Sequence, residues 1–416
     1  MLSSLITLLQ RQFTDATLAT ELHDPHPNGP LFTVLAGIKD PRSRRGIRHP
    51  LQLVLTLAIA AYLANHHSYT QMYEYVVDLW KRNPAWGEQF VHGPPSQDTF
   101  ERVLALINPD ELDTASSGWV ASQLTKRSPG ARKVVRGVKK YADFKTFSAD
   151  GKESRSAKHG TGTRSHNLAA ADQQTGAVLG QVAVREKSNE IPYLKNLLRT
   201  IDENQPGYLS GAVLTVDALH TQRDTAMLIR SYGCEYVMTV KGNQPSLQAE
   251  CAEHAWEQIP VSDVIEDWDH GRYVRRELKL VQPVGALKIA WPWALQVGQL
   301  TRFSQRTAHG KTNSETVYVV TSLAPGMANV SVVNRMLVNH WGIENKVHWV
   351  RDVGFNEDKN QIRRGTAARV AASLANLVLS LLRLAGFDRV AESRRRAGRD
   401  PEFMAGLLLG EIRVEG

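Results

Sequence analysis

Three carboxylates in three different settings are the residues of this sequence best suited to chemistry. Asp150 follows the apolar stretch TFSA, Asp217 follows AVLTV, and Glu344 lies in a segment with helical periodicity. A pair of Mg²⁺ ions, for which Mn²⁺ can substitute, needs hard oxygen ligands brought together from separate elements. Such a pair promotes phosphoryl transfer, because one ion activates the attacking water or hydroxyl and the other stabilises the leaving oxygen. The three carboxylates therefore predict a metal-dependent phosphoryl-transfer site.

The segment around Glu344 carries other polar side chains at helical spacing. Positions three, four or seven apart share one face of a helix, and this face holds two imidazoles, an indole, a carboxylate and a guanidinium: His340, Trp341, Glu344, His348 and Arg351. Such a face suits contact with phosphate and metal better than burial in a core. Two alternatives remain at this stage. The set His340, Glu344 and His348 could hold a zinc ion. Asp352, about two turns beyond Glu344, could instead be the third carboxylate.

Several further side chains are candidates for contact with DNA. Gly151 would let a phosphate approach the backbone beside Asp150. The loop DPRSRRGIRHP could clamp a phosphate or could simply be a solvated basic loop. We expect DNA contacts from the following residues: Lys152, His220, Lys241, Asn243, Trp341, His348, Arg351, Arg363, Arg44 and Arg45. The sequence has no glycine-rich nucleotide loop after a strand, which argues against the use of ATP or NAD.

The elements that must position these carboxylates follow from the periodicity of residues 144–243. Alternating and apolar runs predict three consecutive strands, a helix, a strand that ends at Asp217, a second helix and a final strand. This β-β-β-α-β-α-β order is the ribonuclease H-like arrangement, an α/β fold in which the first and fourth strands are parallel neighbours. Such a pairing would bring Asp150 close to Asp217, while Glu344 would come from a later helix.

Composition and periodicity also divide the whole chain into segments. We expect an N-terminal helical domain with DNA contacts (1–125), a basic linker (126–143), the first part of a ribonuclease H-like catalytic core (144–243), a β-rich insertion (244–330), the catalytic and C-terminal helices of the core (331–386), and a polar, loosely ordered tail (387–416). The linker opens a stretch rich in Lys and Arg that leads directly to Asp150. Such a stretch favours a surface that follows a DNA backbone.

Overall composition narrows the class of protein. The 416 residues carry a formal net charge of +8, which favours a polyanionic partner. Cys234 and Cys251 are the only cysteines, so no disulfide framework is expected and a reducing compartment fits. The longest apolar run, from Leu51 to Ala64, is shorter than the roughly 20 residues that span a bilayer. We therefore expect a soluble cytoplasmic protein with no membrane partner.

Taken together, these segments resemble the H-repeat-associated (ISAs-type) insertion-sequence transposases of the DDE superfamily. The resemblance covers roughly residues 30 to 385 and rests on these stretches, in order: DPRSRRGIRHPLQLVL, PPSQDTFERVLALINPDEL, ADGK, GQVAVREKSNEIP, LTVDALHTQRDTA, YVMTVKGNQPSL, HWGIENKVHWVRDVGFNEDKNQIR and the final apolar helix. One departure is the sequence GKESRSAKHG, which places Glu153 beside the first carboxylate in place of the usual continuation of the family.

The resemblance implies a function as well as a fold. It makes Asp150, Asp217 and Glu344 the three DDE carboxylates, with Mg²⁺ as the metal. It also implies recognition of terminal inverted repeats, DNA strand cleavage and strand transfer, and a nucleoid-associated protein of the bacterial cytoplasm. Cutting two ends in concert implies a homodimer or larger assembly on DNA. The alternatives are a domesticated DNA-binding protein without catalysis and a metal-dependent nuclease without strand transfer.

Overall fold

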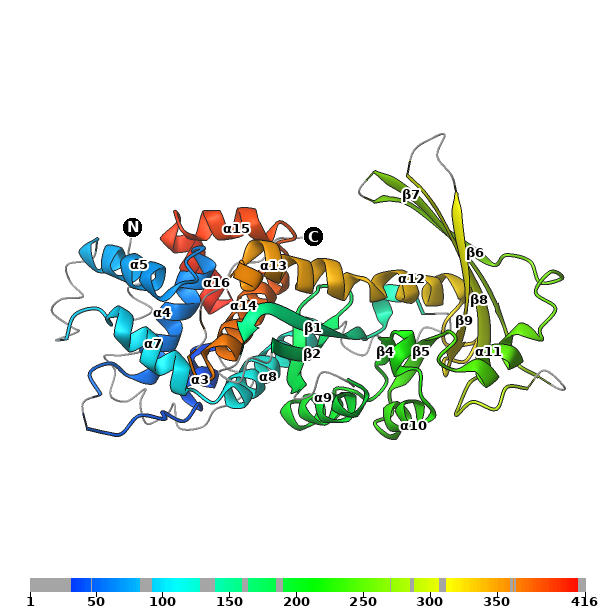
Figure 1. The fold of residues 1–416 in the computed structure, drawn as a ribbon, viewed down its shortest axis with the longest axis horizontal. Helices are drawn as coiled ribbons and strands as arrows, with labels where there is room; N and C mark the ends of the chain where they lie inside the picture. Colours follow the sequence, from blue (N-terminus) through cyan, green and yellow to red (C-terminus); the bar gives the residue numbers. More distant parts are fainter. Residues whose placement is uncertain are drawn as a thin grey trace.

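The computed structural model describes residues 31–45, 47–82, 92–127, 139–158, 164–184, 190–269, 271–284, 288–306, 312–359, 362 and 364–410. The molecule is elongated (Figure 1). A bundle of helices from both ends of the chain forms one end, and a mixed β-sheet runs from its middle to the other end. The structure is thus a mixed α/β fold, with one end built of helices alone and a sheet that other helices cover.

Within the described residues, five N-terminal helices build much of the helical end: α3 (Leu31–Ala36), α4 (Leu51–Leu63), α5 (Tyr69–Lys81), α7 (Gln97–Leu106) and α8 (Pro109–Arg127). Helix α4 is apolar on all sides, and such a helix must be buried all round. It is accordingly buried at every position except Gln52. Ser96 caps α7 by accepting a hydrogen bond from the backbone N–H of Thr99 at 3.3 Å.

The sheet begins after a short turn of 3-10 helix, η1 (Tyr141–Asp143). Its first five strands are β1 (Thr146–Lys158), β2 (Arg164–Asp172), β3 (Val178–Val184), β4 (Val213–Val216) and β5 (Glu235–Val240). Asp150 lies in β1, and Asp217 directly follows β4. They lie in the order β3-β2-β1-β4-β5. Strand β1 is antiparallel to β2 and parallel to β4, with Phe147 opposite Leu214. The predicted parallel pairing of the first and fourth strands is therefore confirmed.

Helices cover both faces of these strands. Helices α9 (Ile191–Asn204) and α10 (Arg223–Ser231) lie on one side of the sheet, and the helical segment after residue 330 lies on the other (Figure 1). Helix α9 is amphipathic, and its buried stripe of Leu194, Leu197, Leu198 and Ile201 packs towards β2 and β3.

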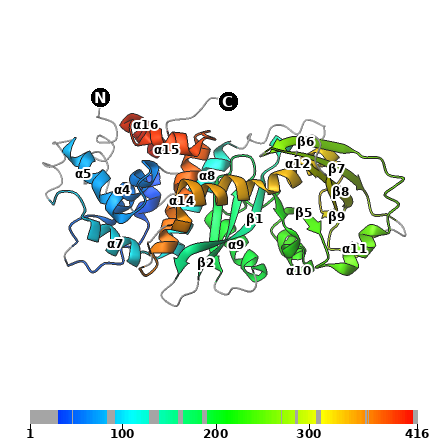
Figure 2. The ribbon, with the colours of Figure 1, turned by 45° about the horizontal axis from the view of Figure 1, so that its top comes forward.

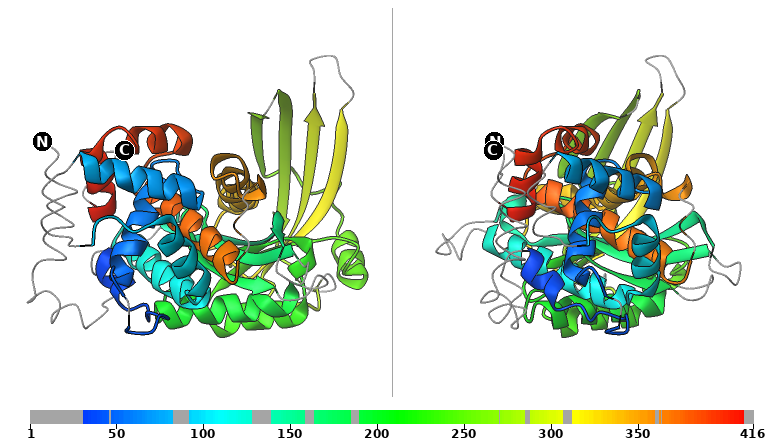
Figure 3. Two further views of the ribbon diagram at one scale, coloured as in Figure 1. Left: turned by 60° about the vertical axis from the view of Figure 1, so that its left-hand side comes forward. Right: turned by 90° about the vertical axis from the view of Figure 1, so that its left-hand side faces the viewer.

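Four more strands extend the same sheet. They are β6 (Asp263–Asp269), β7 (Arg272–Val281), β8 (Gln296–Gln305) and β9 (Asn313–Thr321), and they follow a short helix, α11 (Pro245–Ala252). Because β9 pairs with β5, the sheet has nine strands in the order β3-β2-β1-β4-β5-β9-β8-β7-β6. The far ends of these strands rise away from the body (Figure 3, left). Strand β6 has a weak strand signal, because four of the seven residues in its sequence DVIEDWD are acidic.

The segment that carries Glu344 is helical along almost its whole length, as predicted. It consists of α12 (Val330–His340), a π-helical turn η4 (Glu344–His348) and α13 (Trp349–Gly354), followed by a turn of 3-10 helix, η5 (Glu357–Lys359). A π-turn holds more residues than an α-turn and is frequent at functional sites. It breaks the regular spacing on which the predicted polar face depended. Trp341 and Glu344 are exposed, whereas His348 and Arg351 are buried.

The C-terminal part of the chain joins the helical end of the molecule. Helix α14 (Ala367–Leu384) lies between the N-terminal helices and the first strands (Figure 2). By length and composition alone α14 could cross a membrane, but 83% of its apolar window is buried inside the fold. Helices α15 (Val390–Ala397) and α16 (Pro401–Leu409) follow it.

The predicted loosely ordered tail is therefore wrong for residues 390–409. Phe403, Met404, Leu407 and Leu408 are buried in α16. In α15 the buried guanidinium of Arg394 donates to the backbone oxygen of Tyr62 at 2.7 and 3.0 Å. The run of arginines gave no indication of this packing, because the sequence does not show whether a charged side chain is solvated or hydrogen-bonded inside the fold.

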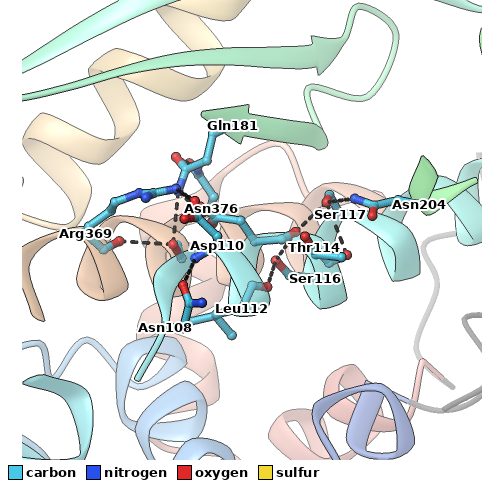
Figure 4. A network of polar contacts seen from close by, with 12 residues as sticks. Asn108, Asp110, Leu112, Thr114, Ser116, Ser117, Gln181, Asn204, Arg369 and Asn376 are labelled. Atoms are coloured by element: carbon cyan, nitrogen blue, oxygen red, sulfur yellow. Dashed lines mark hydrogen bonds and ion pairs between the residues drawn. The ribbon is translucent and has the colours of Figure 1, made fainter. Parts of the chain in front are cut away.

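A buried polar network joins α8, β3 and α14 (Figure 4). The side chain of Gln181 donates to Asp113 at 2.8 Å and to Ser373 at 3.0 Å, and it accepts from Asn376 at 2.7 Å. Arg369 donates to the second oxygen of Asp113 at 3.1 Å. Burial raises the pKa of the Asp113 carboxyl to about 6, against the opposing effect of these partners. The network thus links the N-terminal helices to the sheet through a single buried acid.

Candidate active site

The sheet register brings the first two carboxylates together. Ser148 of β1 pairs with Thr215 of β4, and their hydroxyls are 3.0 Å apart. Asp150 and Asp217 each lie two residues beyond this pair, and parallel strands point their carboxyl ends to the same edge of the sheet. Glu344 opens the π-turn on the covering helical segment. All three carboxylates line one cavity of about 360 Å³.

The carboxylates in this cavity repel one another. Burial raises the pKa of Asp150 to about 7, and the charges of neighbouring carboxylates, that of Asp217 above all, add to the effect. Among the residues that the structure describes, no Lys or Arg forms an ion pair with Asp150, Asp217 or Glu344. Negative charge is therefore concentrated on these three side chains, and no described Lys or Arg is ion-paired with them.

Two imidazoles border the carboxylates, that of the buried His348 and that of the partly buried His340. His348 places its Nδ1 atom 3.4 Å from the Oδ2 atom of Asp150. His340 places its Nδ1 atom 2.9 Å from the hydroxyl of Thr215. Burial lowers the pKa of His348 to about 3 and that of His340 to about 4, so both rings are neutral at ordinary pH. A neutral ring can orient Asp150 by a hydrogen bond without adding positive charge.

The zinc alternative finds no support in these contacts. The Nδ1 atoms of His340 and His348 face different partners on different strands, rather than a common point beside Glu344. Across the described part of the chain, no three His, Cys, Asp or Glu side chains are grouped closely enough to hold a metal ion. The three carboxylates share a cavity without forming a closed set of ligands.

Glu190 is a fourth acid at this site, and the sequence reasoning missed it. Its Oε1 atom is 2.8 Å from Nε2 of His166, and its Oε2 atom is 3.7 Å from Nε2 of His220. Burial opposes ionisation of Glu190, but the two imidazoles outweigh it and lower the pKa to about 2. The carboxylate lies against the Cα atom of Gly151, where an added Cβ would overlap it. The close approach predicted at Gly151 is thus made by a side chain of the protein.

Two of the residues predicted to contact DNA form buried ion pairs within the protein instead. The ammonium of Lys152 is 2.6 Å from the carboxylate of Asp352, and the Lys152 residue is only 8% exposed. The guanidinium of Arg351 is fully buried and makes two bonds of 2.6 Å to Glu357. Asp352, the rival for the third carboxylate, is thus paired with a lysine, and it is Glu344 that lines the cavity.

The remaining predicted contacts fall into different places. Lys241 and Trp341 line the cavity, and Lys241 also pairs with Glu315 at 3.1 Å. His220 is buried, and the side chain of Asn243 donates to the backbone oxygen of Ala218 at 2.6 Å, so it braces the loop after β4. Arg44 and Arg45 are exposed in the loop between α3 and α4, at the helical end of the molecule (Figure 1). Arg363 lies outside the described residues.

Comparison with known families decides the relationship. The family described as "Transposase DDE domain" matches residues 133–381, and the family described as "DDE_Tnp_1-associated" matches residues 32–120. The chain belongs to the DDE transposase family. The predicted resemblance is thereby confirmed.

Individual relatives agree with this membership at modest identity. "H repeat-associated putative transposase YhhI" of Escherichia coli (strain K12) is 26% identical over 397 residues, which cover 90% of this chain and 96% of YhhI. "Putative transposase YncI" of Escherichia coli O157:H7 is 27% identical over 371 residues, which cover 85% of this chain and 87% of YncI. Among solved structures, the piggyBac transposase synaptic complex with hairpin DNA aligns with 97% of this chain and 81% of its own, at 13% identity and a TM-score of 0.38.

Proposed function

We propose that this transposase binds the terminal inverted repeats of an insertion sequence and catalyses DNA strand cleavage and strand transfer with Asp150, Asp217 and Glu344. The observation that carries the proposal is the shared cavity, in which three carboxylates from two strands and a helix gather without an ion-paired lysine or arginine among the described residues. Membership of the DDE transposase family supports the choice of DNA as substrate.

The donor set fits a hard divalent cation. The three side chains offer only carboxylate oxygens, which suit Mg²⁺ or Mn²⁺ rather than zinc. Burial, and after it the charge of the neighbouring carboxylates, raises the pKa of Asp150, and a bound cation would neutralise that charge. Asp150, Asp217 and Glu344 would hold the metal, which when bound activates a water or 3′-hydroxyl and stabilises the leaving oxygen.

The surrounding residues position these carboxylates and the phosphodiester. The neutral ring of His348 orients Asp150, and the bonds between Thr215, Ser148 and His340 hold the end of β4 against the covering helix. Lys241, Arg276 and Arg302 line the same cavity and offer positive charge to the phosphate. Two ends must be cut in concert, so the active form would be a homodimer or larger assembly at the nucleoid.

The test is strand cleavage and joining by the full-length protein on DNA that carries the inverted repeats flanking its own element. The reaction is run with Mg²⁺, with Mn²⁺ and with EDTA, for wild type and for Asp217→Asn, Glu344→Gln and Asp352→Asn. We expect metal-dependent products that disappear in the first two variants and persist in the third, with circular dichroism confirming that all fold.

Other outcomes would replace the proposal. Cleavage without joining would make the protein a nuclease, and specific end binding without cleavage would make it a non-catalytic DNA-binding protein. Loss of activity in Asp352→Asn with retention in Glu344→Gln would move the third carboxylate to Asp352.

A further inference from the structure

A buried series of hydrogen bonds runs from the interior of the sheet to the catalytic cavity. It begins at Gln173, directly after β2, and passes through the hydroxyls of Ser148 on β1 and Thr215 on β4. It ends at the Nδ1 atom of His340, the last residue of α12, which packs on these strands (Figure 1). Gln173, Ser148 and Thr215 are buried, whereas His340 lines the cavity that holds the three carboxylates.

The contacts of Gln173 leave its amide only one orientation. Its Nε2 atom is 3.2 Å from the backbone oxygen of Met336, which can only accept a hydrogen bond. The same nitrogen is 2.9 Å from the hydroxyl of Ser148 and 2.8 Å from that of Thr215. An amide nitrogen donates and does not accept, so both hydroxyls turn a lone pair towards it. Each hydroxyl must therefore direct its own proton elsewhere.

The remaining contacts decide where these two protons go. Among the described residues, the hydroxyl of Ser148 has one further partner, the hydroxyl of Thr215 at 3.0 Å, so Ser148 donates to Thr215. The Thr215 hydroxyl then has one acceptor for its proton, the Nδ1 atom of His340 at 2.9 Å. A ring nitrogen that accepts carries no proton, so the proton of the neutral imidazole is on Nε2.

The opposite tautomer would leave a buried group unsatisfied. With its proton on Nδ1, His340 would donate to Thr215 and Thr215 to Ser148, and within the described part of the chain the Ser148 proton would have no acceptor. Ser148 is only 1% exposed, and a buried donor without an acceptor destabilises a fold. The backbone oxygen of Thr215 raises the pKa of His340 and so attracts a ring proton. That attraction supplies no acceptor for Ser148, so the form with the proton on Nε2 is favoured.

The Nε2 atom of His340 is placed to act on a ligand. Because Nδ1 is bonded to Thr215, Nε2 is the ring nitrogen left for a ligand, and the residue lines the cavity together with Asp217 and Glu344. Burial lowers the pKa of His340 to about 4, so at neutral pH the ring carries one proton and no charge. A neutral N–H in this cavity can donate to an oxygen of a phosphate group without competing with a cation for the carboxylates.

We propose that Thr215, oriented by Gln173, fixes His340 in the tautomer that carries its proton on Nε2, and that this N–H donates to an oxygen of the phosphate that is cut. The inference rests on the proposed function and adds two positioning residues to it, since Thr215 and Gln173 act through His340 and touch no substrate. Negative charge develops on the phosphate oxygens during the reaction, so the hydrogen bond strengthens in the transition state and lowers the barrier.

The tautomer is measurable without any cleavage. Full-length protein labelled with ¹⁵N-histidine is studied by two-bond ¹H–¹⁵N NMR in EDTA at neutral pH, and the signals of His340 are those absent from His340→Gln. We expect the proton on Nε2 in wild type and in Thr215→Ser, which keeps a hydroxyl. Thr215→Val keeps the shape of the side chain but has no hydroxyl, so this form should no longer dominate. Ser148→Ala is the matched control, because it removes a buried hydroxyl from the same series and keeps the bond between Thr215 and His340; it should keep the wild-type tautomer.

Single-turnover cleavage of transposon-end DNA in Mg²⁺ measures the consequence of the tautomer. His340→Leu should cleave about a hundredfold more slowly, which is the loss expected when one donor to a developing negative charge is removed. His340→Gln, whose amide also offers a neutral N–H, should recover part of the rate. Thr215→Val should be slowed about tenfold and Thr215→Ser should restore the rate. Binding of the ends in EDTA should be the same in all four variants, because the donor acts on the transition state.

Several results would overturn the proposal. They are a wild-type ring with its proton on Nδ1, a wild-type ring with protons on both nitrogens, and a Thr215→Val protein that keeps the proton on Nε2. Failure of the proposed function is a separate result, because cleavage by wild type tests it alone and the NMR measurement needs no cleavage. If wild type cleaves while Thr215→Val changes the tautomer and cleaves at the wild-type rate, the function stands and the role of the His340 tautomer falls.

Discussion

Two acidic sites beside the same sheet, one a single buried carboxyl of α8 and the other a cluster of three carboxylates, differ in how their charge is balanced. At β3 the buried Asp113 is held by Gln181 and Arg369, so both of its oxygens have partners. At the ends of β1 and β4, Asp150 and Asp217 face one another and Glu344 with no ion-paired lysine or arginine among the described residues. A buried charge that serves only the fold is paired, because an unpaired one destabilises it. The unbalanced cluster is therefore the one that we assign to a ligand.

The helical segment that contains Glu344 repeats this contrast over a few residues. Arg351 forms an ion pair with Glu357, and Asp352 forms one with Lys152, each at 2.6 Å. Glu344, on the preceding turns, has no such partner among the described residues and lines the cavity. A charged residue of this segment thus stabilises the fold where a side chain of opposite charge pairs with it, and it is available for chemistry where no such partner is present.

The largest expected effect is on catalysis at the unbalanced cluster. Asp150→Asn should lower strand cleavage at least about a thousandfold, because the metal-dependent stabilisation of the transition state amounts to several kcal/mol. The same substitution removes one of the mutually repelling charges, so the thermal midpoint of the metal-free protein should stay the same or rise. Cleavage assays and calorimetry in EDTA measure the two effects. A midpoint lowered by several degrees would mean that Asp150 stabilises the fold, and the contrast between the clusters would fail.

The opposite pattern is expected at the balanced pair of Arg351 and Glu357. Glu357→Ala leaves the fully buried guanidinium of Arg351 without its bidentate carboxylate, which should destabilise the protein by about 3–5 kcal/mol. Denaturant unfolding of the variant measures this loss. The double variant Glu357→Leu with Arg351→Met is the control, since replacing both members with apolar residues should recover most of the stability. No recovery would show that packing, rather than charge, accounts for the loss.

The pH dependence of stability tests the Asp113 network. Burial raises the pKa of Asp113 from 3.8 to about 6 in the folded protein. Below pH 4 the carboxyl is protonated in both folded and unfolded chains. Between pH 4 and 6 the unfolded chain releases this proton while the folded protein keeps it, so stability should fall, by on the order of 3 kcal/mol, and then level off. Above pH 6 both forms are ionised.

The variant Asp113→Asn isolates this effect from the other titrating groups. The difference in thermal midpoint between wild type and Asp113→Asn should change across pH 4 to 6 and be constant above that range. A difference that is constant from pH 4 to 7 would mean that Arg369 and Gln181 compensate the charge of Asp113 completely.

The sequence predicted the part of the site that depends on local pattern. Apolar runs ending in Asp150 and Asp217 marked two strands, and the order of elements predicted that these strands are parallel neighbours, as they are. The helical segment with Glu344 was also predicted. These features follow from periodicity and strand order, which a single sequence carries.

What the sequence did not predict depends on contacts between distant residues. The pattern placed Lys152 and Arg351 at the site but could not show that they form ion pairs with Asp352 and Glu357. The π-turn, which buries Arg351 and exposes Glu344, has no sequence signal that we recognised. For the arginines of β7 a signal was present, since the alternation in RYVRREL places Arg272 and Arg276 on one face of a strand.

The smallest expected change in stability concerns Glu190, the acid that the sequence reasoning missed. Gly151→Ala would place a Cβ in the position of the Glu190 carboxylate, which lies at the end of a flexible side chain and can rotate away. The free energy of unfolding should therefore change by less than about 1 kcal/mol. Cleavage should fall about tenfold, because Glu190 would leave its place between His166 and His220 beside Asp150, one of the proposed metal ligands.

Gly180→Ala on β3 is the matched control, since its added Cβ meets only side-chain atoms of Ile201 and Leu197 at 3.3 Å or more. It should leave cleavage unchanged. Glu190→Gln separates charge from shape, because the amide keeps the size of the side chain while losing the anion that His166 and His220 attract. Activity retained in Gly151→Ala and lost in Glu190→Gln would show that cleavage depends on the charge of Glu190 and not on the exact position of its carboxylate. Activity retained in both would make Glu190 a structural partner of the two histidines, and the functional cluster would be limited to the three carboxylates that line the cavity.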